Sequence, residues 1–180
     1  GEATQRVTAV SGKEVSFTSK TEQKLGSRTF KFENRIVSQY GIAPKRMTAG
    51  KSGTVAVADW TVLDTFWPLT AGKTVRLNFE IFRTTRRDIG KAKPSLRGRS
   101  AFTATGAERI DVLGEGHDTI VLERTTYDEI LAAKTPVKRE IRYRIWWSRT
   151  VNWMVRMEMI GTSGGKTYRR TVTATKLVSP

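Results

Sequence analysis

Stiff, β-branched side chains dominate this chain and constrain what it can fold into. Threonine, valine and isoleucine together account for 50 of its 180 residues. Because a second heavy atom on Cβ restricts χ1, these side chains fit a pleated sheet better than a helix. The chain is therefore expected to be built mainly from strands.

Alternation between apolar and polar residues indicates where the strands lie. The two clearest stretches are residues 75–81 and 141–147, in which every second residue is apolar. Shorter strands are expected at residues 7–10, 15–18, 29–36, 55–60, 101–105, 109–113, 119–124, 154–160 and 168–176. Many short strands separated by glycine-containing breaks are typical of an antiparallel sandwich or a partly open barrel. We expect one all-β domain over residues 1–180.

At most one short helix is expected, near residues 127–133. The segment runs from Tyr127 to Ala133, and Asp128 is a plausible N-cap residue because its carboxylate can accept from backbone N–H groups.

The charge balance is strongly basic. The chain has 32 lysine and arginine residues against 17 aspartate and glutamate residues, a formal net charge of +15. Its 38% hydrophobic residues exceed what a disordered basic tail would carry. No run reaches the roughly 18 apolar residues of a membrane span, so no transmembrane segment is expected.

Several kinds of catalytic or metal site lack the residues they need. The chain has no cysteine and one histidine, His117, which is expected in a surface turn. Three Gly-Lys-Ser/Thr segments, at residues 50–52, 72–74 and 165–167, lack the upstream glycine of a phosphate-binding loop, so they are interpreted as β-turns. No Gly-x-Ser-x-Gly elbow is present. We expect no enzyme activity, no metal and no cofactor.

The region from 141 to 159 predicts a hairpin with a basic outer face. If residues 148–152 form the turn, Trp147 opposes Trp153 and Arg144 opposes Arg156. A second hairpin, through residues 161–166, then brings Arg169 beside Glu158. The expected outer patch has four arginines around this glutamate: Arg142, Arg144, Arg156 and Arg169. It is interpreted either as an anion site or as solvated arginines on an exposed sheet.

The most basic segment spans residues 83–99 and includes Arg86 and Arg87, with a net charge of +6. Its glycines and proline predict a long loop inserted between two strands, which would attract polyanions or simply keep the protein soluble. The loop has no aromatic residue for base stacking, which argues against specific nucleic-acid binding.

Residues 60–69 form the densest apolar segment and include Trp60 and Trp67. These side chains are interpreted as core packing or, alternatively, as the rim of an apolar ligand cavity that also involves Trp147.

Two segments carry a resemblance to known proteins. Residues 66–74, Phe-Trp-Pro-Leu-Thr-Ala-Gly-Lys-Thr, resemble the entry into a strand found in bacterial exported β-rich proteins of unknown function. Residues 143–148 (Tyr-Arg-Ile-Trp-Trp-Ser), followed by 154–158 (Met-Val-Arg-Met-Glu), resemble a hairpin of the same group. The likeness spans approximately residues 60–179 and extends loosely to lipoprotein-carrier half-barrels. The chain departs from the group at Trp147, where tyrosine is usual, and in its basic 83–99 insertion.

The resemblance implies export, an all-β fold and no described catalytic residue. Gly1-Glu2-Ala3-Thr4 is no signal peptide, and an export signal removed before Gly1 is compatible with this start. We therefore expect a periplasmic or secreted location.

The leading functional hypothesis is a non-enzymatic, exported bacterial β-domain that binds an anionic envelope component. Its partner would be an anionic lipid, a glycan or an acidic protein. The ligand-binding candidates are Arg142, Arg144, Arg156, Arg169, Arg86, Arg87, Trp67 and Trp147. The alternatives are a carrier of an apolar ligand in a β-sheet cavity and nonspecific nucleic-acid binding.

Overall fold

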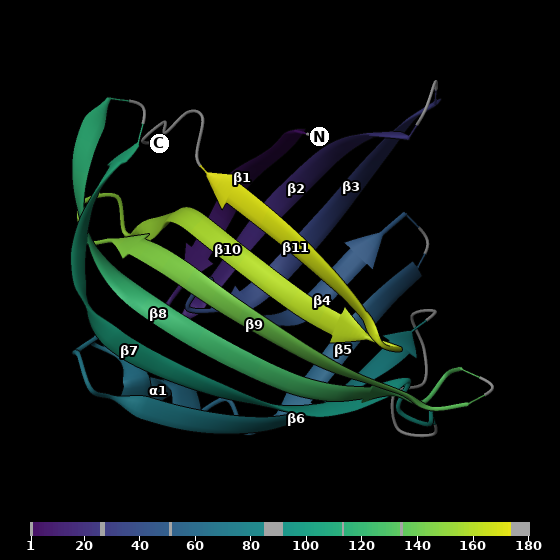
Figure 1. Cartoon of the computed structure of the whole chain (residues 1–180). Coiled ribbons are helices and arrows are strands. Elements are labelled where there is room, and N and C mark those ends of the chain that lie inside the picture. Colours follow the sequence, from purple (N-terminus) through teal and green to yellow (C-terminus); the bar gives the residue numbers. More distant parts are fainter. Residues whose placement is uncertain are drawn as a thin grey trace. The chain divides into compact units, whose positions relative to one another are not determined.

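The described residues fold as antiparallel β-structure with one short helix, which confirms the predicted all-β class (Figure 1). The computed structural model describes residues 2–25, 28–50, 52–84, 92–112, 114–133 and 135–173. Its elements are β1 (Glu2–Ser11), β2 (Glu14–Leu25), β3 (Arg28–Gln39), β4 (Ala43–Ala49), β5 (Ser52–Ala58), α1 (Val62–Phe66), β6 (Thr74–Thr84), β7 (Leu96–Val112), β8 (Glu115–Ile130), β9 (Val137–Ser148), β10 (Trp153–Ser163) and β11 (Lys166–Thr173).

Strands that follow one another in the chain are also neighbours in the sheet. A sandwich needs two sheets, whereas the described strands belong to one sheet with the order β1 to β11. Hairpins or short loops join β8, β9, β10 and β11, as antiparallel neighbours allow, whereas the connection from β5 to β6 contains α1.

The helix lies elsewhere than predicted. Residues 127–130 are the last part of β8, and the helix is α1 at Val62–Phe66. Tyr127 pairs with a residue on each flanking strand, and the Asp128 carboxylate binds Arg139 instead of capping a helix. Strand pairing on both sides thus overrides the local preference.

One strand was not predicted, and several are longer than predicted. Strand β4 lies between the predicted strands at 29–36 and 55–60; Gly41 forms the turn before it, and Pro44 stands near its start, where proline is tolerated. Strand β7 joins two predicted strands, 101–105 and 109–113, into one. It passes between them through a register irregularity at residues 104–106.

The chain divides into two compact units, each described by itself. Unit 1 comprises Gly1–Val57 and Glu80–Ser95, and unit 2 comprises Ala58–Phe79 and Leu96–Pro180. Strand β6 contributes residues to both. A single domain over residues 1–180 remains a prediction.

Unit 1 contains β1 to β5 and has a small core. Phe17 and Ile42 are buried, while the outer ends of β2 and β3 are joined by exposed pairs between Lys20 and Glu33 and between Lys31 and Glu22. The pairs are cross-strand neighbours that contribute little stability because water screens them.

Unit 2 holds the larger core. In α1, Leu63 and Phe66 are fully buried, and the Phe66 ring lies 6.3 Å from that of Phe102 in β7. Ahead of the helix, the Asp59 carboxylate accepts hydrogen bonds from the backbone N–H and the hydroxyl of Thr61, which fixes the entering turn. The helix therefore packs on one face of β7 through Phe66.

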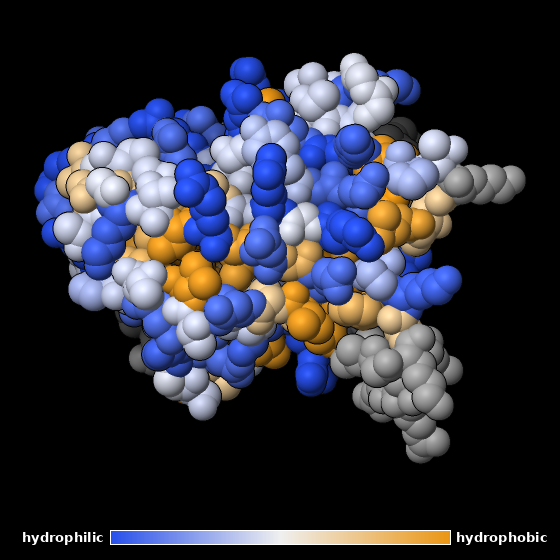
Figure 2. Space-filling model, turned by 90° about the horizontal axis from the view of Figure 1, so that it is seen from below, coloured by the Kyte–Doolittle hydropathy of each residue, from blue (hydrophilic) through white to orange (hydrophobic). Residues whose placement is uncertain are grey.

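Residues of β7 to β10 alternate between two faces. The face on which α1 packs includes Phe102, Leu122 and Ile145, and is called the helix face; the other, which includes Trp146, is called the opposite face. On the molecular surface, Figure 2 shows hydrophilic residues that separate several smaller apolar groups.

Candidate functional site

The β9–β10 hairpin forms as predicted, but its register differs. Ser148 pairs with Trp153, so the turn has four residues rather than five, and Asn152 adopts a left-handed backbone conformation with φ 48°. A bulge at Val155 then shifts the register once more. As a result Arg144 lies opposite Glu158, and the predicted direct opposition of Arg144 and Arg156 is wrong.

Trp146 brings these two arginines together instead. The guanidinium carbons of Arg144 and Arg156 lie 5.2 and 4.9 Å from the centroid of its indole ring. The ring is only 5% exposed and packs with Val121 and Val155 in a small core on the opposite face. A buried indole is a favourable surface for guanidinium groups, so the tryptophan positions both.

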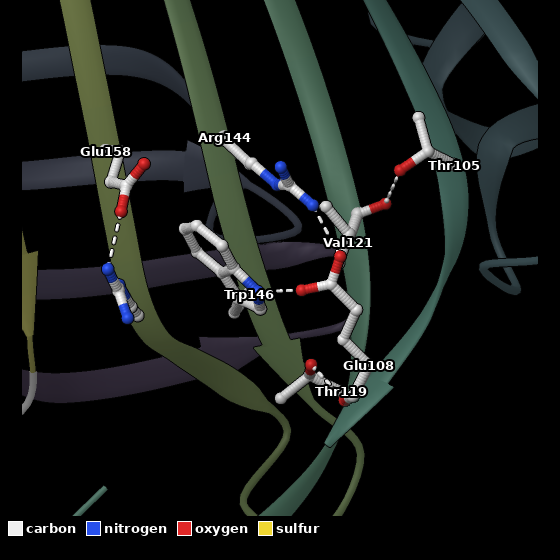
Figure 3. A network of polar contacts seen from close by, with 8 residues as sticks. Thr105, Glu108, Thr119, Val121, Arg144, Trp146 and Glu158 are labelled. Carbon is white, nitrogen blue, oxygen red and sulfur yellow. Dashed lines mark hydrogen bonds and ion pairs between the residues drawn. The ribbon is translucent and has the colours of Figure 1, made fainter. Parts of the chain in front are cut away.

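Carboxylates neutralise the two arginines (Figure 3). Glu108 accepts from Arg144 and, at 2.8 Å, from the indole Nε1 of Trp146, while Arg156 donates to Glu158 at 2.6 Å. The hydrogen bond from Trp146 lowers the pKa of Glu108, and the charge of Arg144 adds to the effect, whereas desolvation acts the other way. Two arginines and two glutamates leave this network without net charge.

The other two arginines of the predicted patch are less enclosed. Arg142 donates to Glu140 at 2.6 Å with 69% of its side chain exposed. Arg169 lies opposite Ile160, so Thr171 and not Arg169 is the β11 neighbour of Glu158. Among the residues that the structure describes, no carboxylate forms an ion pair with Arg169. The anion site on this face remains a prediction.

Part of the basic 83–99 segment belongs to the strands. Arg86 and Arg87 lie outside the described residues, and β7 already begins at Leu96. Within β7, the exposed Arg99 lies over the ring of Tyr127 at 5.3 Å. The described end of the segment therefore adds a basic residue to the opposite face.

Aromatic side chains meet at the end of the helix face where α1 packs. Trp67 stands edge-on to Trp147 with ring centroids 5.5 Å apart, and Trp153 follows at 5.8 Å. Trp147 is only 5% exposed. The structure thus brings together the predicted residues Trp67 and Trp147, and the core-packing interpretation applies to Trp147.

The helix face carries an arginine that the sequence analysis did not single out. Arg124 stands between Phe102 on β7 and Tyr143 on β9, with its guanidinium carbon 5.1 and 5.2 Å from the two ring centroids. Its Nε donates to the hydroxyls of Ser100 and Thr126 at 3.3 and 3.0 Å. The sequence could have indicated this position, because Arg124 lies two and four residues along the strand from the apolar Leu122 and Ile120 and therefore on the same face.

A carboxylate–arginine pair lies next to it. The Asp128 carboxylate accepts two hydrogen bonds from Arg139, at 2.7 and 2.8 Å, and its side chain is only 5% exposed. This bidentate geometry raises the pKa of Arg139, first through the hydrogen bonds. Both carboxylate oxygens of Asp128 therefore accept hydrogen bonds from Arg139.

Burial and mutual charges shift the pKa of the groups in this cluster. Desolvation lowers the pKa of Arg124, with partial compensation from Tyr143 and Asp128. Burial raises the pKa of Tyr143, which keeps its phenol neutral. Arg124 and Arg139 both carry a positive charge, since arginine stays protonated at neutral pH.

His117 is placed differently from the prediction. It belongs to β8 rather than to a surface turn, is 5% exposed, and lies with Nδ1 3.5 Å from the hydroxyl of Ser148. Within the described ranges no group of three metal-ligating side chains occurs. The described part of the chain has no helix of the length and apolarity that crossing a bilayer requires.

Comparison with known proteins yields one remote structural likeness. No family model matches the chain, and no curated protein matches it. The chain is similar to the crystal structure of the hypothetical lipoprotein YmcC from Escherichia coli (K12), with 6% sequence identity and a TM-score of 0.48. The similarity covers 94% of this chain and 79% of that one.

Proposed function

We propose that this chain is a non-enzymatic, exported bacterial β-domain that binds an anionic component of the cell envelope. The observation that carries the proposal is Arg124, held between two aromatic rings on the helix face of a chain whose formal net charge is +15. The partner would be an anionic lipid, a glycan or an acidic protein.

Arg124 is only partly exposed to solvent. Water screens such a charge less than an exposed one, so a half-buried guanidinium group attracts an anion more strongly. Rings on either side and two hydroxyls fix Arg124 before any ligand arrives. Pre-positioning reduces the entropy lost on binding, so an incoming oxyanion meets a site that is already formed.

The opposite face has a different role in this proposal. In this proposal the exposed side chains of Arg142 and Arg169 attract polyanions from a distance, whereas Arg144 and Arg156 are paired with Glu108 and Glu158. Arg86 and Arg87, outside the described residues, stay candidates for the same attraction. Such attraction weakens with ionic strength because salt screens exposed charges.

The test compares the two faces. Binding of phosphatidylglycerol vesicles and of the acidic glycan polygalacturonate is measured by sedimentation and calorimetry for wild type, Arg124→Gln and Arg142→Gln. We expect Arg124→Gln to weaken binding of at least one probe by about tenfold, and Arg142→Gln by less than about twofold. Arg124→Lys, which retains the charge, controls for folding and should bind more tightly than Arg124→Gln.

Two outcomes would refute parts of the proposal. Equal binding by wild type and a folded Arg124→Gln variant would remove the helix-face site. Undiminished binding by the double variant Arg144→Glu, Arg156→Glu at low salt would remove the role of the opposite face.

A carrier of an apolar ligand is the second candidate. The half-buried methionines Met154, Met157 and Met159 of β10 favour it, because methionine adapts to varied apolar shapes. Native mass spectrometry that detects a co-purified apolar molecule would support this function, and a protein that carries none and binds none would exclude it.

A further inference from the structure

The outer end of the β2–β3 hairpin has one edge without a neighbouring strand. Strand β3 pairs with β2 over its whole length, but with β4 only from Arg35 to Gln39. Along residues 29–34, no strand of the described part of the chain pairs with the other edge of β3. Figure 1 shows this end of the hairpin beyond β4. An edge of this kind presents unpaired backbone N–H and C=O groups to which a further strand can bind.

Two aromatic side chains on one face of this end are exposed. Phe30 and Phe32 are 41% and 50% exposed, and their stacked rings have centroids 6.5 Å apart. The edge has neither a proline in residues 29–34 nor a bulge against β2, two features that commonly prevent strand addition. Exposed aromatic rings beside such an edge are typical of a surface that binds another strand.

The other face of the same end carries four charged side chains. Lys20 lies opposite Glu33, with 3.4 Å between the ammonium nitrogen and a carboxylate oxygen, and Lys31 lies opposite Glu22 at 3.3 Å. On β3, Lys31 and Glu33 stand two residues apart and therefore on the same face. The edge thus shows one positive and one negative side chain, and a strand with the reverse order would pair with both.

We propose that a second copy of this chain binds here, with the two β3 strands antiparallel and the two-fold axis at Phe32. In this register Phe32 lies opposite the partner's Phe32, Lys31 opposite the partner's Glu33, and Glu33 opposite the partner's Lys31. Each charged row then alternates in sign over four strands: Lys20, Glu33, the partner's Lys31 and the partner's Glu22. Opposite charges on paired strands stabilise a sheet, and a two-fold axis repeats each favourable contact.

The charges distinguish this register from its neighbours. An axis at Lys31 would set the two copies of that lysine opposite each other, and an axis at Glu33 would do the same with the glutamates. Like charges so placed destabilise a sheet. An axis at Phe30 would leave Lys31 opposite the partner's Thr29, without an opposite charge. Among these four registers, the axis at Phe32 alone gives both charged positions a partner of opposite sign.

The overall charge of the chain restricts where two copies can meet. A net charge of +15 on each copy repels the other, whereas the two lysines and two glutamates of the hairpin sum to zero. An anionic membrane would bind cations without any need for alternating signs, and an unrelated extended peptide would match the alternation only by chance. Because the contact is small, we expect a dissociation constant between about 1 and about 100 μM.

Sedimentation velocity of the full chain, from about 1 to about 300 μM, measures this association. Wild type should change from monomer to dimer within this range. Lys31→Glu and Glu33→Lys each place like charges at both pairs between the copies, so each should weaken the dimer at least about tenfold. An equimolar mixture of the two variants should dimerise again, because every pair between the copies then joins a glutamate to a lysine.

Two exposed residues of unit 2 provide the matched controls. Lys138→Glu and Glu115→Lys change the net charge as the two test variants do, and both should alter the dissociation constant by less than about twofold. Recovery on mixing is a result that misfolding of the single variants would not produce.

Cysteine substitution tests the position of the axis, because the chain has no cysteine of its own. Directly opposed residues on antiparallel strands have Cα atoms about 4.5–5.5 Å apart, which is within the range of a disulfide. Phe32→Cys should therefore form a covalent dimer with oxidised glutathione as the oxidant. Phe30→Cys is the control, because the two copies of residue 30 would lie about 13 Å apart along the strands, too far for a disulfide.

Three results would overturn the inference. Wild type that stays monomeric up to about 300 μM would remove the dimer and leave the edge to an unrelated peptide. A mixture of the charge variants that does not dimerise would refute the charge pairing, and a covalent dimer of Phe30→Cys but not of Phe32→Cys would refute the axis. The inference does not depend on the proposed function, since Arg124 belongs to unit 2 and the hairpin to unit 1.

Discussion

The indole Nε1 of Trp146 donates a hydrogen bond of 2.8 Å to the Oε2 atom of Glu108. Trp146 is on β9 and Glu108 on β7, with β8 between them, so the bond reaches across a strand. The other carboxylate oxygen accepts from Arg144, which also lies over the same ring. This bond therefore couples the apolar core of the opposite face to its charged surface.

Replacement of Trp146 by phenylalanine tests this coupling. Phenylalanine keeps an aromatic ring in the core but lacks the donor, so we expect a loss of about 1 kcal/mol in the free energy of unfolding, measured by urea denaturation. In a double-mutant cycle with Glu108→Gln, the two effects should be non-additive. Full additivity would show that the bond contributes nothing.

Because the pKa of Glu108 is lowered in the folded state, the free energy of unfolding should depend on pH in a predictable direction. Because the folded state favours the charged carboxylate, its contribution to stability is present above the unfolded pKa and is lost as the pH falls through the lowered folded pKa. Wild type should therefore exceed Glu108→Gln in stability at pH 7, by under about 1 kcal/mol given the exposure. The difference should begin to shrink as the pH falls below the ordinary glutamate pKa of about 4.3, and should continue to shrink toward pH 3.

Thermal unfolding of both proteins from pH 7 to pH 3 measures this difference. Glu115→Gln, which alters an exposed residue at the start of β8, is the control. A stability gap between wild type and Glu108→Gln that stays constant with pH would contradict the assignment.

Replacing aspartate by the neutral asparagine should lower the free energy of unfolding much more at Asp128 than at Asp118, although each of them binds an arginine. Asp128 is 5% exposed and binds Arg139 in bidentate fashion, while Asp118 is 73% exposed and binds Arg109 through one contact. Asp128→Asn leaves half-buried guanidinium charge uncompensated and should cost about 3 kcal/mol. Asp118→Asn should cost under about 0.5 kcal/mol. Comparable losses in urea denaturation would refute the distinction.

Glycine is required at residue 98 by close packing. A Cβ at Gly98 would stand 2.7 Å from the backbone oxygen of Tyr127 and 2.8 Å from the ring of Phe79. Gly98→Ala should therefore destabilise the fold by about 2 kcal/mol, as overpacking does. At Gly106 a Cβ meets nothing within 4 Å, so Gly106→Ala should change the free energy of unfolding by less than about 0.5 kcal/mol. Similar melting temperatures for the two variants would contradict this prediction.

Local pattern was a sound guide to strands but a poor guide to register. The alternation at residues 141–147 correctly predicted β9 and the hairpin after it. The register failed because it depends on whether the turn has four or five residues and on one inserted residue at Val155. A bulge leaves no mark in the alternation until the partner strand is known.

The site shows the same division. The predicted pair Arg144 and Arg156 does come together, but over Trp146, with the predicted Glu158 beside Arg156 and with Glu108, which the sequence analysis did not assign to it. In the sequence, Arg124 is a charged residue at a strand position whose neighbours on the same face are apolar. Its meaning depended on Phe102 and Tyr143, which only the pairing of β7 and β9 with β8 places beside it.

The sequence by itself determined the β-structure, because restricted β-branched side chains and period-2 alternation act within a few residues of each other. It also determined the basic charge, which is a property of composition. Tertiary structure decided which carboxylates pair with which arginines, because Glu108 and Asp128 reach Arg144 and Arg139 from other strands. It also decided where the helix forms, since residues 127–130 extend as a strand only with a partner on each side.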